Sequence, residues 1–205
     1  MAEEIGGQGF GVNVADPASV EDAFARLDTP ARVAVNCAGI APAARIVGRE
    51  GKLSLDVFER VIRVNLIGTF NVMSVAARAM SDLKPLGEER GVIVNTASVA
   101  FEDGQLGQAA YAASKGGVAA LGLPAARELA QHGIRVVAIA PGLFRTPMME
   151  ALPDEVTDRI AANVPFPSRL GDPAEFARMV QAIVENPYLN GTTIRLDGAV
   201  RLPPR

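Results

Sequence analysis

The chain lacks the residues and segments that would cross-link it internally or hold it in a membrane. It has 205 residues, and its single cysteine cannot form an internal disulfide. No stretch of about 18 uncharged apolar residues occurs, and a helix needs roughly that length to cross a bilayer. The first residues, from Met1 to Gly7, have neither the basic nor the apolar region of a secretory signal. We therefore expect a cytoplasmic protein with no membrane partner.

Basic residues are also too few to predict a nucleic-acid partner. The chain has 20 Lys and Arg against 23 Asp and Glu, a net charge of -3. No basic cluster is present that would neutralise a row of phosphates, so we expect no binding to nucleic acid. The length and a hydrophobic content of 49% are sufficient for one domain with a sizeable core. We treat residues 1–205 as that single domain.

Apolar segments of strand length alternate with longer segments of helical character. This alternation predicts an α/β fold, with a doubly wound parallel sheet covered by helices. The expected strands are 10–14, 32–37, 91–97, 134–140 and 192–196. The expected helices are 17–27, 54–81, 109–131, 153–162 and 173–185.

Three of these helices carry recognisable end signals. Ser54 is placed to cap the long helix that begins after it. Asp172, followed by a proline and by Glu175, supplies an N-cap and an acid three residues on. His132 precedes Gly133 at a predicted helix end, where an imidazole can meet free carbonyls, and we assign it a structural role.

The most informative pattern is Tyr111 and Lys115 on one predicted helix, with Ser98 thirteen residues before the tyrosine. Positions i and i+4 share a helix face, so the ammonium can lie close to the phenol and lower its pKa from about 10. A phenol of lowered pKa is a better general acid or base at neutral pH. Ser98 ends a buried strand, and open α/β sheets bind their ligands at that end.

The tyrosine–lysine spacing alone would also fit an ordinary solvated helix face. The surrounding residues are small and apolar, which does not fit a solvated stripe. With Ser98, the three residues resemble the catalytic set of the short-chain dehydrogenase/reductase family. The resemblance implies a Rossmann-like fold, with Tyr111 as acid/base, Ser98 orienting the substrate oxygen, and Lys115 tuning the tyrosine and holding the nicotinamide ribose.

Three further motifs carry the same resemblance. The N-C-A-G turn at 36–39 is similar to the family's turn beneath the cofactor, and P-G-L-F-R-T at 141–146 resembles its loop at the nicotinamide end. Asn65, inside a predicted helix, is similar to the family's fourth catalytic residue, which supports a proton relay to the lysine; alternatively it is a buried amide bonded to backbone. The residues implied to bind cofactor are Asn13, Val14, Asn36, Cys37, Ala38, Gly39, Tyr111, Lys115, Pro141, Gly142, Phe144 and Thr146.

The front of a nicotinamide-binding sheet normally has a strand, a glycine-rich turn and a helix that together receive the pyrophosphate. Gly6, Gly7, Gly9 and Gly11 fit neither G-x-G-x-x-G nor the family's G-x-x-x-G-x-G, and no strand precedes them. By comparison with the family, Met1 falls near the end of the second helix. We therefore expect an N-terminally truncated domain without its first βαβ unit, whether by nature, by a mis-assigned start or as a fragment.

Two of the residues implied to contact the cofactor, Asn13 and Cys37, need separate interpretation. Asn13 stands where the family usually has an aspartate that meets the adenine amino group, so adenine recognition should be weaker. We interpret Cys37 as a packed residue that faces the cofactor rather than as a reactive thiol.

Within the family, the segments 90–100, 104–111 and 164–173 resemble type-2 3-hydroxyacyl-CoA dehydrogenases. The resemblance implies NAD-dependent oxidation of 3-hydroxyacyl-CoA, and in some members of hydroxysteroids, with Gln108 beside Ser98 and Tyr111 at the substrate. NADP stays open as the cofactor. In the family, the residues that distinguish NAD from NADP lie at the end of the second strand, which this chain lacks. Arg45, Arg49 and Lys52 would attract an anionic CoA, or would simply form a solvated loop.

Two alternatives stay open at this point. One is a 3-oxoacyl-[acyl-carrier-protein] reductase that uses NADPH, with the same fold. The other is a non-catalytic remnant or assembly partner. The resemblance also implies a homo-oligomer, a tetramer or a dimer, built largely through the helices at 54–81 and 109–131. No metal site is expected.

Overall fold

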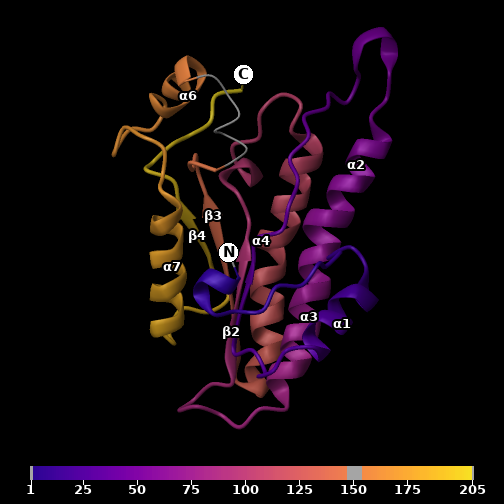
Figure 1. Cartoon of the computed structure of the whole chain (residues 1–205). Coiled ribbons are helices and arrows are strands. Elements are labelled where there is room, and N and C mark those ends of the chain that lie inside the picture. The colour runs from indigo at the N-terminus through magenta and orange to yellow at the C-terminus, as the bar shows by residue number, and fades with distance from the viewer. Residues whose placement is uncertain (1, 147–153, 205) are drawn as a thin grey trace.

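A computed structural model describes residues 2–146 and 154–204, and its centre is a parallel sheet (Figure 1). The strands are β1 (Val33–Asn36), β2 (Gly91–Thr96), β3 (Ile134–Pro141) and β4 (Thr193–Leu196). They lie in the order β1-β2-β3-β4, and every neighbouring pair is parallel. The predicted parallel α/β architecture is therefore confirmed.

Helices connect these strands in the way that a parallel sheet requires. The bounds are α1 (Pro17–Ala25), α2 (Leu55–Ile62), a π-helical turn (Arg63–Ile67), α3 (Gly68–Ser81), α4 (Ala109–Leu129), α6 (Asp154–Ala161) and α7 (Pro173–Glu185). Short 3₁₀ turns occupy Glu3–Ile5, Arg49–Gly51, Val99–Phe101 and Ala130–His132. The predicted helix 153–162 begins at a residue outside the described parts, and the rest of it matches α6.

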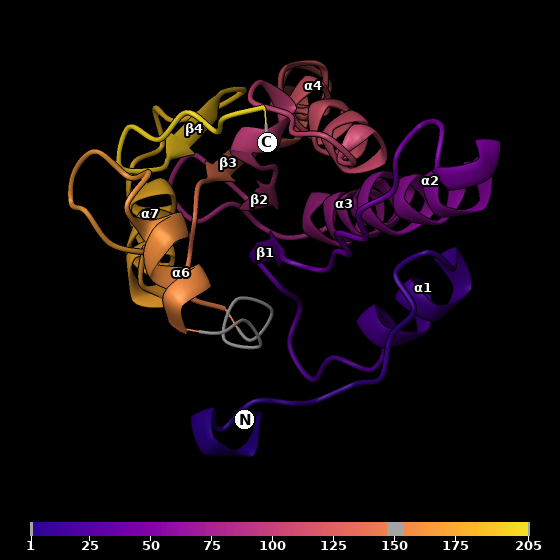
Figure 2. The same ribbon diagram turned by 90° about the horizontal axis from the view of Figure 1, so that it is seen from above.

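Two layers of helices enclose the sheet (Figure 2). On one face, Met73 of α3 and Ala126 of α4 pack against Ile93 and Val136 of the central strands. On the other face, Ile183 of α7 packs against a second set of strand side chains, Val92, Val94, Val137 and Ile139. Because both faces are covered, the central strands read as continuous apolar runs, as buried parallel strands do.

The predicted strand at 10–14 is wrong. This segment is extended but pairs with no strand in the described part of the chain, and Figure 2 shows it running outside the sheet toward α1. A strand needs a neighbouring ladder for its backbone groups, and β1 pairs with β2 alone in the described sheet. Val33 and Val35, on one face of β1, are 42% and 39% exposed, whereas Ala34 and Asn36 on its other face are buried.

Of the two predicted N-caps, Ser54 and Asp172, only the second is confirmed. Ser54 precedes α2 but makes no capping bond; its hydroxyl donates instead to the carbonyl of Arg45 at 2.9 Å, so that prediction is wrong. At α7 the prediction is confirmed, since Asp172 accepts from the backbone N–H of Ala174 and Glu175 accepts from that of Asp172.

Candidate active site

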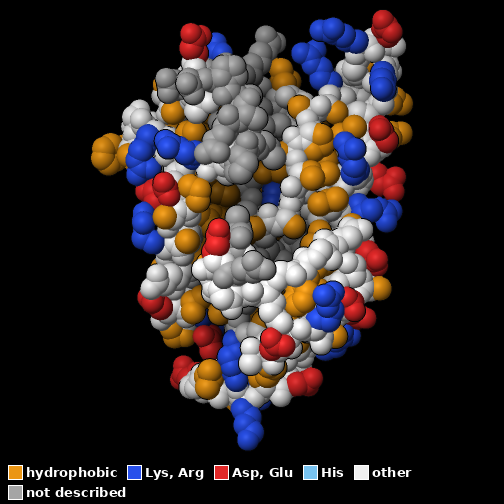
Figure 3. Space-filling model, in the orientation of Figure 1, with side chains coloured by type: hydrophobic (Ala, Val, Ile, Leu, Met, Phe, Trp, Pro, Cys, Tyr) orange, Lys and Arg blue, Asp and Glu red, His pale blue; other side chains and the backbone are white. Residues whose placement is uncertain are grey.

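A cleft of about 530 Å³ opens at the carboxyl ends of β1, β2 and β3. Cys37 follows β1, Ser98 follows β2, and Pro141 ends β3. The lining residues are Cys37, Gly39, Ile40, Ala41, Thr96, Ser98, Val99, Ala100, Gln105, Gln108, Tyr111, Lys115, Pro141, Gly142, Leu143, Phe144, Thr146 and Leu202. Figure 3 shows that this side of the molecule is hollowed near its middle, with hydrophobic side chains along the margins.

Ser98, Tyr111 and Lys115 meet in this cleft, as their spacing predicts. Tyr111 and Lys115 lie one helical turn apart on α4, and the Tyr111 side chain is hydrogen-bonded to that of Ser98. The Ser98 hydroxyl also accepts from the backbone N–H of Ala100 at 3.2 Å, which caps the short helix Val99–Phe101. Ser98 is therefore held in place by the backbone and points at the phenol.

Lys115 is almost completely buried, with 5% of its surface exposed. Its Nζ donates to the carbonyl oxygen of Thr96 at 2.6 Å and lies 5.9 Å from the centre of the Tyr111 ring. Burial lowers the pKa of Lys115 to about 8, partly opposed by the neighbouring Cys37. A strand-end carbonyl thus fixes the direction of the ammonium.

The expectation that Lys115 lowers the pKa of Tyr111 is wrong for this structure. The pKa of Tyr111 is raised from its ordinary value, because burial of the phenol outweighs the hydrogen bond from Ser98, which lowers it. The sequence predicts the proximity of the two side chains but not the loss of solvent around them. Tyr111 is therefore held in its protonated form, ready to donate.

The buried lysine predicts a pH dependence of stability. Between pH 8 and 10 the unfolded chain binds a proton at Lys115 more readily than the folded chain, whose lysine has a pKa of about 8 against an ordinary 10.5. The free energy of unfolding should therefore rise with pH across that window, by up to about 1.4 kcal/mol per unit. Urea unfolding of wild type and Lys115→Met at pH 8 and 10 measures this contribution.

The exposed Lys52 supplies the control, since Lys52→Met should leave the slope unchanged. Tyr111, whose pKa is raised, acts in the opposite direction as the phenol ionises in the unfolded chain, around its ordinary pKa of about 10, and it does so equally in wild type and Lys115→Met. A slope equal in wild type and Lys115→Met would show that the lysine is not desolvated.

Asn65 does not line the cleft, but its side chain is hydrogen-bonded to the backbone of Ile40, which does. It is fully buried in the π-helical turn between α2 and α3, which breaks the single helix predicted at 54–81. Its side chain accepts from the backbone N–H of Ile40 at 2.8 Å and donates to the Ile40 carbonyl and to Ser114. π-turns are frequent at functional sites. The amide therefore fixes the segment after β1, and its part in a proton relay stays a prediction.

The remaining residues predicted to bind cofactor divide into three groups. Six of them line the cleft: Cys37, Gly39, Pro141, Gly142, Phe144 and Thr146. Cys37 is exposed, so its interpretation as a packed residue is wrong. Asn36 and Ala38 belong to the same turn, where the Asn36 amide donates to Asn95 across the sheet at 2.8 Å. Asn13 and Val14 lie outside the cleft lining; the Asn13 amide oxygen accepts from Ala15, and the Val14 carbonyl accepts from Asn71.

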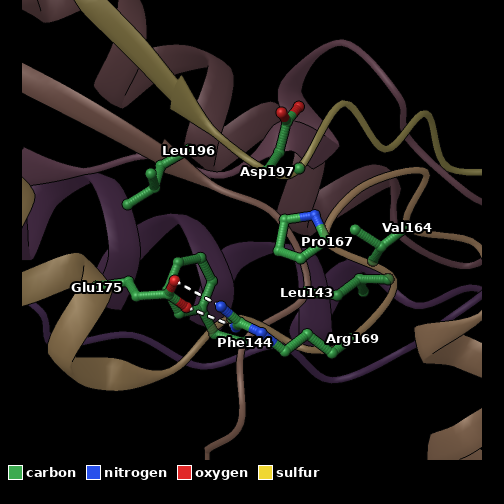
Figure 4. Close-up of a pocket in the computed structure, with 10 residues that line it drawn as sticks. Leu143, Phe144, Val164, Pro167, Arg169, Glu175, Leu196 and Asp197 are labelled. Atoms are coloured by element: carbon green, nitrogen blue, oxygen red, sulfur yellow. Dashed lines mark hydrogen bonds and ion pairs between the residues drawn. The ribbon is translucent and has the colours of Figure 1, made fainter.

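Several lining residues were not predicted from the sequence. Thr96 acts through a backbone carbonyl, which no side-chain motif reveals. Leu202 comes from the C-terminal tail, and Gln105 and Leu143 stand beside predicted residues without a motif of their own. A smaller cavity of about 110 Å³ lies behind Phe144, where Arg169 makes a bidentate ion pair with Glu175 of α7 (Figure 4).

The family model described as "Enoyl-(Acyl carrier protein) reductase" matches residues 1–200. The chain is also 57% identical over 187 residues to "3-hydroxyacyl-CoA dehydrogenase type-2" of Rattus norvegicus, a match that covers 90% of this chain and 70% of the relative. The chain belongs to the short-chain dehydrogenase/reductase family. This outcome confirms the resemblance found in the sequence.

Solved structures of short-chain dehydrogenases/reductases agree with the fold. The 3-hydroxyacyl-CoA dehydrogenase type-2 of Mycobacterium avium superposes with a TM-score of 0.95 at 42% identity, covering 100% of this chain and 82% of that one. A 3-oxoacyl-[acyl-carrier protein] reductase of Brucella melitensis superposes with a TM-score of 0.84 at 30% identity, covering 98% and 77%. The Rossmann-like classification is therefore confirmed.

Two further kinds of feature were sought in the described residues of this short-chain dehydrogenase/reductase: groups of metal ligands and membrane-spanning helices. Within residues 2–146 and 154–204, no three His, Cys, Asp or Glu side chains gather as metal ligands would. In the same residues, no helix combines the length and apolar character needed to cross a membrane.

Proposed function

We propose that the chain catalyses reversible hydride transfer between NAD and the 3-hydroxy or 3-oxo group of an acyl-CoA. The observation that carries the proposal is the meeting of Ser98, Tyr111 and Lys115 in one cleft, with the serine bonded to the phenol. The names of the rat and mycobacterial relatives support the substrate class. Hydroxysteroids are a second candidate class, and the setting would be fatty acid metabolism. The cytoplasmic location also stays a proposal.

Each residue has a definite part in this chemistry. When bound, the nicotinamide cofactor supplies or accepts the hydride. Tyr111 gives its phenolic proton to the 3-oxo oxygen during reduction and takes it back during oxidation. Ser98 donates to the same oxygen and orients it, while Gln108 lies beside the substrate. Lys115 holds the nicotinamide ribose and stabilises the phenolate that forms when Tyr111 loses its proton.

The space at Gly39 supports the proposal that the cleft receives the ribose at the nicotinamide end of the cofactor. At Gly39, a Cβ atom would lie 3.3 Å from Oδ1 of Asn65 and 3.7 Å from Nζ of Lys115. Glycine therefore keeps open the space in front of the lysine, where a ribose would sit. We propose NAD rather than NADP on the resemblance to the type-2 enzymes.

A second cavity favours CoA as the carrier of the acyl group. This cavity of about 810 Å³ is lined by residues 44–47 and 104–109, and it shares Gln105 and Gln108 with the catalytic cleft. Arg45 is among its lining residues, and Arg49 and Lys52 are exposed a few residues later in the chain. The positively charged side chain of Arg45, beside a cavity that adjoins the catalytic cleft, would suit the phosphates of CoA. The alternative of a solvated loop predicts that Arg45→Ala leaves the Michaelis constant for acyl-CoA unchanged.

Two assays test the function against its alternatives. The proposal predicts oxidation of NADH by acetoacetyl-CoA at saturating nucleotide. A 3-oxoacyl-[acyl-carrier-protein] reductase would instead prefer NADPH with acetoacetyl carrier protein, as the name of the Brucella relative suggests. A non-catalytic assembly partner would turn over neither pair.

We also propose a homo-oligomer, a dimer or a tetramer. Large apolar side chains stand exposed along α2, the π-turn and α3, with Leu55 73%, Phe58 44%, Ile67 44% and Phe70 50% exposed. A set of this kind on neighbouring turns is typical of an interface. Sedimentation velocity at micromolar concentration should show a species larger than a monomer, and Phe70→Asp should shift it toward the monomer. A wild-type chain that sediments as a monomer would contradict the proposal.

A further inference from the structure

Arg195, at β4, gathers three carboxylates around one guanidinium. It pairs with Asp103 at 2.7 Å, with Asp197 at 2.8 Å and with Glu102, while its side chain is only 18% exposed. It also donates to the carbonyl of Val200 at 3.1 Å. One mostly buried cation thus joins β4, the turn after it and a loop more than 90 positions earlier in the chain.

That earlier loop is the one that carries the catalytic serine. Glu102 and Asp103 follow the short helix Val99–Phe101, whose first turn is capped by Ser98. The backbone N–H groups of both acids donate to the carbonyl of Val99. Ser98 therefore holds one end of this short helix, and Arg195 holds the residues at its other end.

The C-terminal tail is bound to the same loop at a second place. The Pro203 carbonyl accepts from the Gln105 side chain at 2.9 Å, and the Pro204 carbonyl accepts from the backbone N–H of Leu106 at 3.0 Å. Figure 1 shows the end of the chain beside the loop that precedes α4. Between these bonds and the fully buried Val200, Leu202 is placed in the lining of the cleft.

The two arms of the substrate would meet different surroundings. A 3-oxoacyl-CoA has a thioester arm, which ends in phosphates, and a hydrocarbon arm on the far side of the reacting carbon. The cavity beside Arg45 suits the first arm. The second arm needs apolar surface, which Leu202 and Leu143 supply in the cleft.

We propose that Leu202 is a specificity-determining residue that contacts the hydrocarbon arm, and that Arg195 is the positioning residue that holds the tail against the cleft. This inference rests on the proposed acyl-CoA function. It assigns the C-terminal tail a role in selecting the length of the acyl chain. A purely structural Arg195 would affect stability without affecting that selection.

Binding of two unreactive ligands tests the role of Leu202. Dissociation constants for butyryl-CoA and decanoyl-CoA are measured by calorimetry on the whole chain, which requires no turnover. Leu202→Trp should fill the apolar part of the cleft and weaken decanoyl-CoA by at least about 10-fold, or roughly 1.4 kcal/mol, while butyryl-CoA changes little. The matched control is Leu86→Trp, since Leu86 is 66% exposed and lies outside the cleft lining.

A double-mutant cycle tests Arg195. If Arg195 holds the tail, Leu202→Trp in an Arg195→Met background should change the ratio of the two dissociation constants by less than about 3-fold, because the tail no longer stays in the cleft. Arg201→Met is the control; Arg201 also pairs with Asp197 but is 63% exposed. Should Arg195→Met fail to fold, Asp103→Asn, which neutralises one of its partners, takes its place in the cycle.

The outcomes separate this inference from the function on which it rests. A wild-type chain that binds neither acyl-CoA overturns the proposed substrate and this inference with it. Binding of both ligands with no change of ratio in Leu202→Trp overturns the role of Leu202 alone. A full Leu202→Trp effect that persists without Arg195 overturns the positioning role.

Discussion

The 205-residue chain should bind NADH at least about 10²-fold more weakly than the Mycobacterium avium 3-hydroxyacyl-CoA dehydrogenase type-2, a loss of roughly 3 kcal/mol. In this fold the pyrophosphate is received by backbone N–H groups of a glycine-rich turn between a strand and a helix. Gly6 to Gly11 do not supply that turn, because the described residues around them form no strand. By the family resemblance, the remaining cofactor contacts, from Asn36 to Thr146, would reach mainly the adenine edge and the nicotinamide end.

Fluorescence titration of NADH into both purified proteins, in one buffer, measures the difference. AMP provides a control, because it lacks the nicotinamide and should bind this chain more weakly still. Micromolar binding of NADH by the 205-residue chain would show that the chain holds the phosphates without that glycine-rich turn.

Replacing Tyr111 by Phe should lower turnover of acetoacetyl-CoA by at least about 10²-fold at saturating NADH, the usual scale for a lost general acid. The phenol is hydrogen-bonded to Ser98 in the cleft, and burial raises its pKa, which keeps it protonated. Removing its oxygen leaves the ring and its packing in place. The rate is measured from the loss of NADH absorbance, with thermal unfolding recorded to show that the variant folds.

The chain provides its own control, because its other tyrosine is Tyr188, which is 97% exposed. Tyr188→Phe should keep the wild-type rate. Ser98→Ala should also lower turnover substantially with little change in stability, since it removes one hydroxyl at a strand end. Near-full activity in Tyr111→Phe would remove the phenol from the mechanism.

Elements with strong local signals were predictable from the sequence. The helix predicted at 173–185 has those bounds in α7, because Asp172 and Glu175 form a complete capping box there. The buried strands at 91–97 and 134–140 were recognisable as apolar runs, and their covering on both faces explains why. The prediction of a strand at 10–14 was wrong, because a strand depends on a neighbouring strand that the local sequence does not specify.

The candidate site was predictable where it depends on spacing, and not where it depends on tertiary contacts. Helical periodicity alone places Tyr111 beside Lys115. The raised pKa of Tyr111 depends on how much protein surrounds the phenol, which the sequence does not state. Leu202 lines the cleft and Arg195 pairs with its loop from the far end of the chain, so the roles proposed for them could not be inferred before these contacts were known.

Transfer of an isotope label tests the central claim most directly, because product accumulates even when turnover is slow. The chain is incubated with acetoacetyl-CoA and with NADH that carries deuterium at its transferable position, and the product is examined by mass spectrometry. The account predicts 3-hydroxybutyryl-CoA with one deuterium at carbon 3, formed by wild type and almost absent with Tyr111→Phe. Unlabelled product, or equal labelled product from both proteins, would contradict hydride transfer in the Ser98–Tyr111–Lys115 cleft.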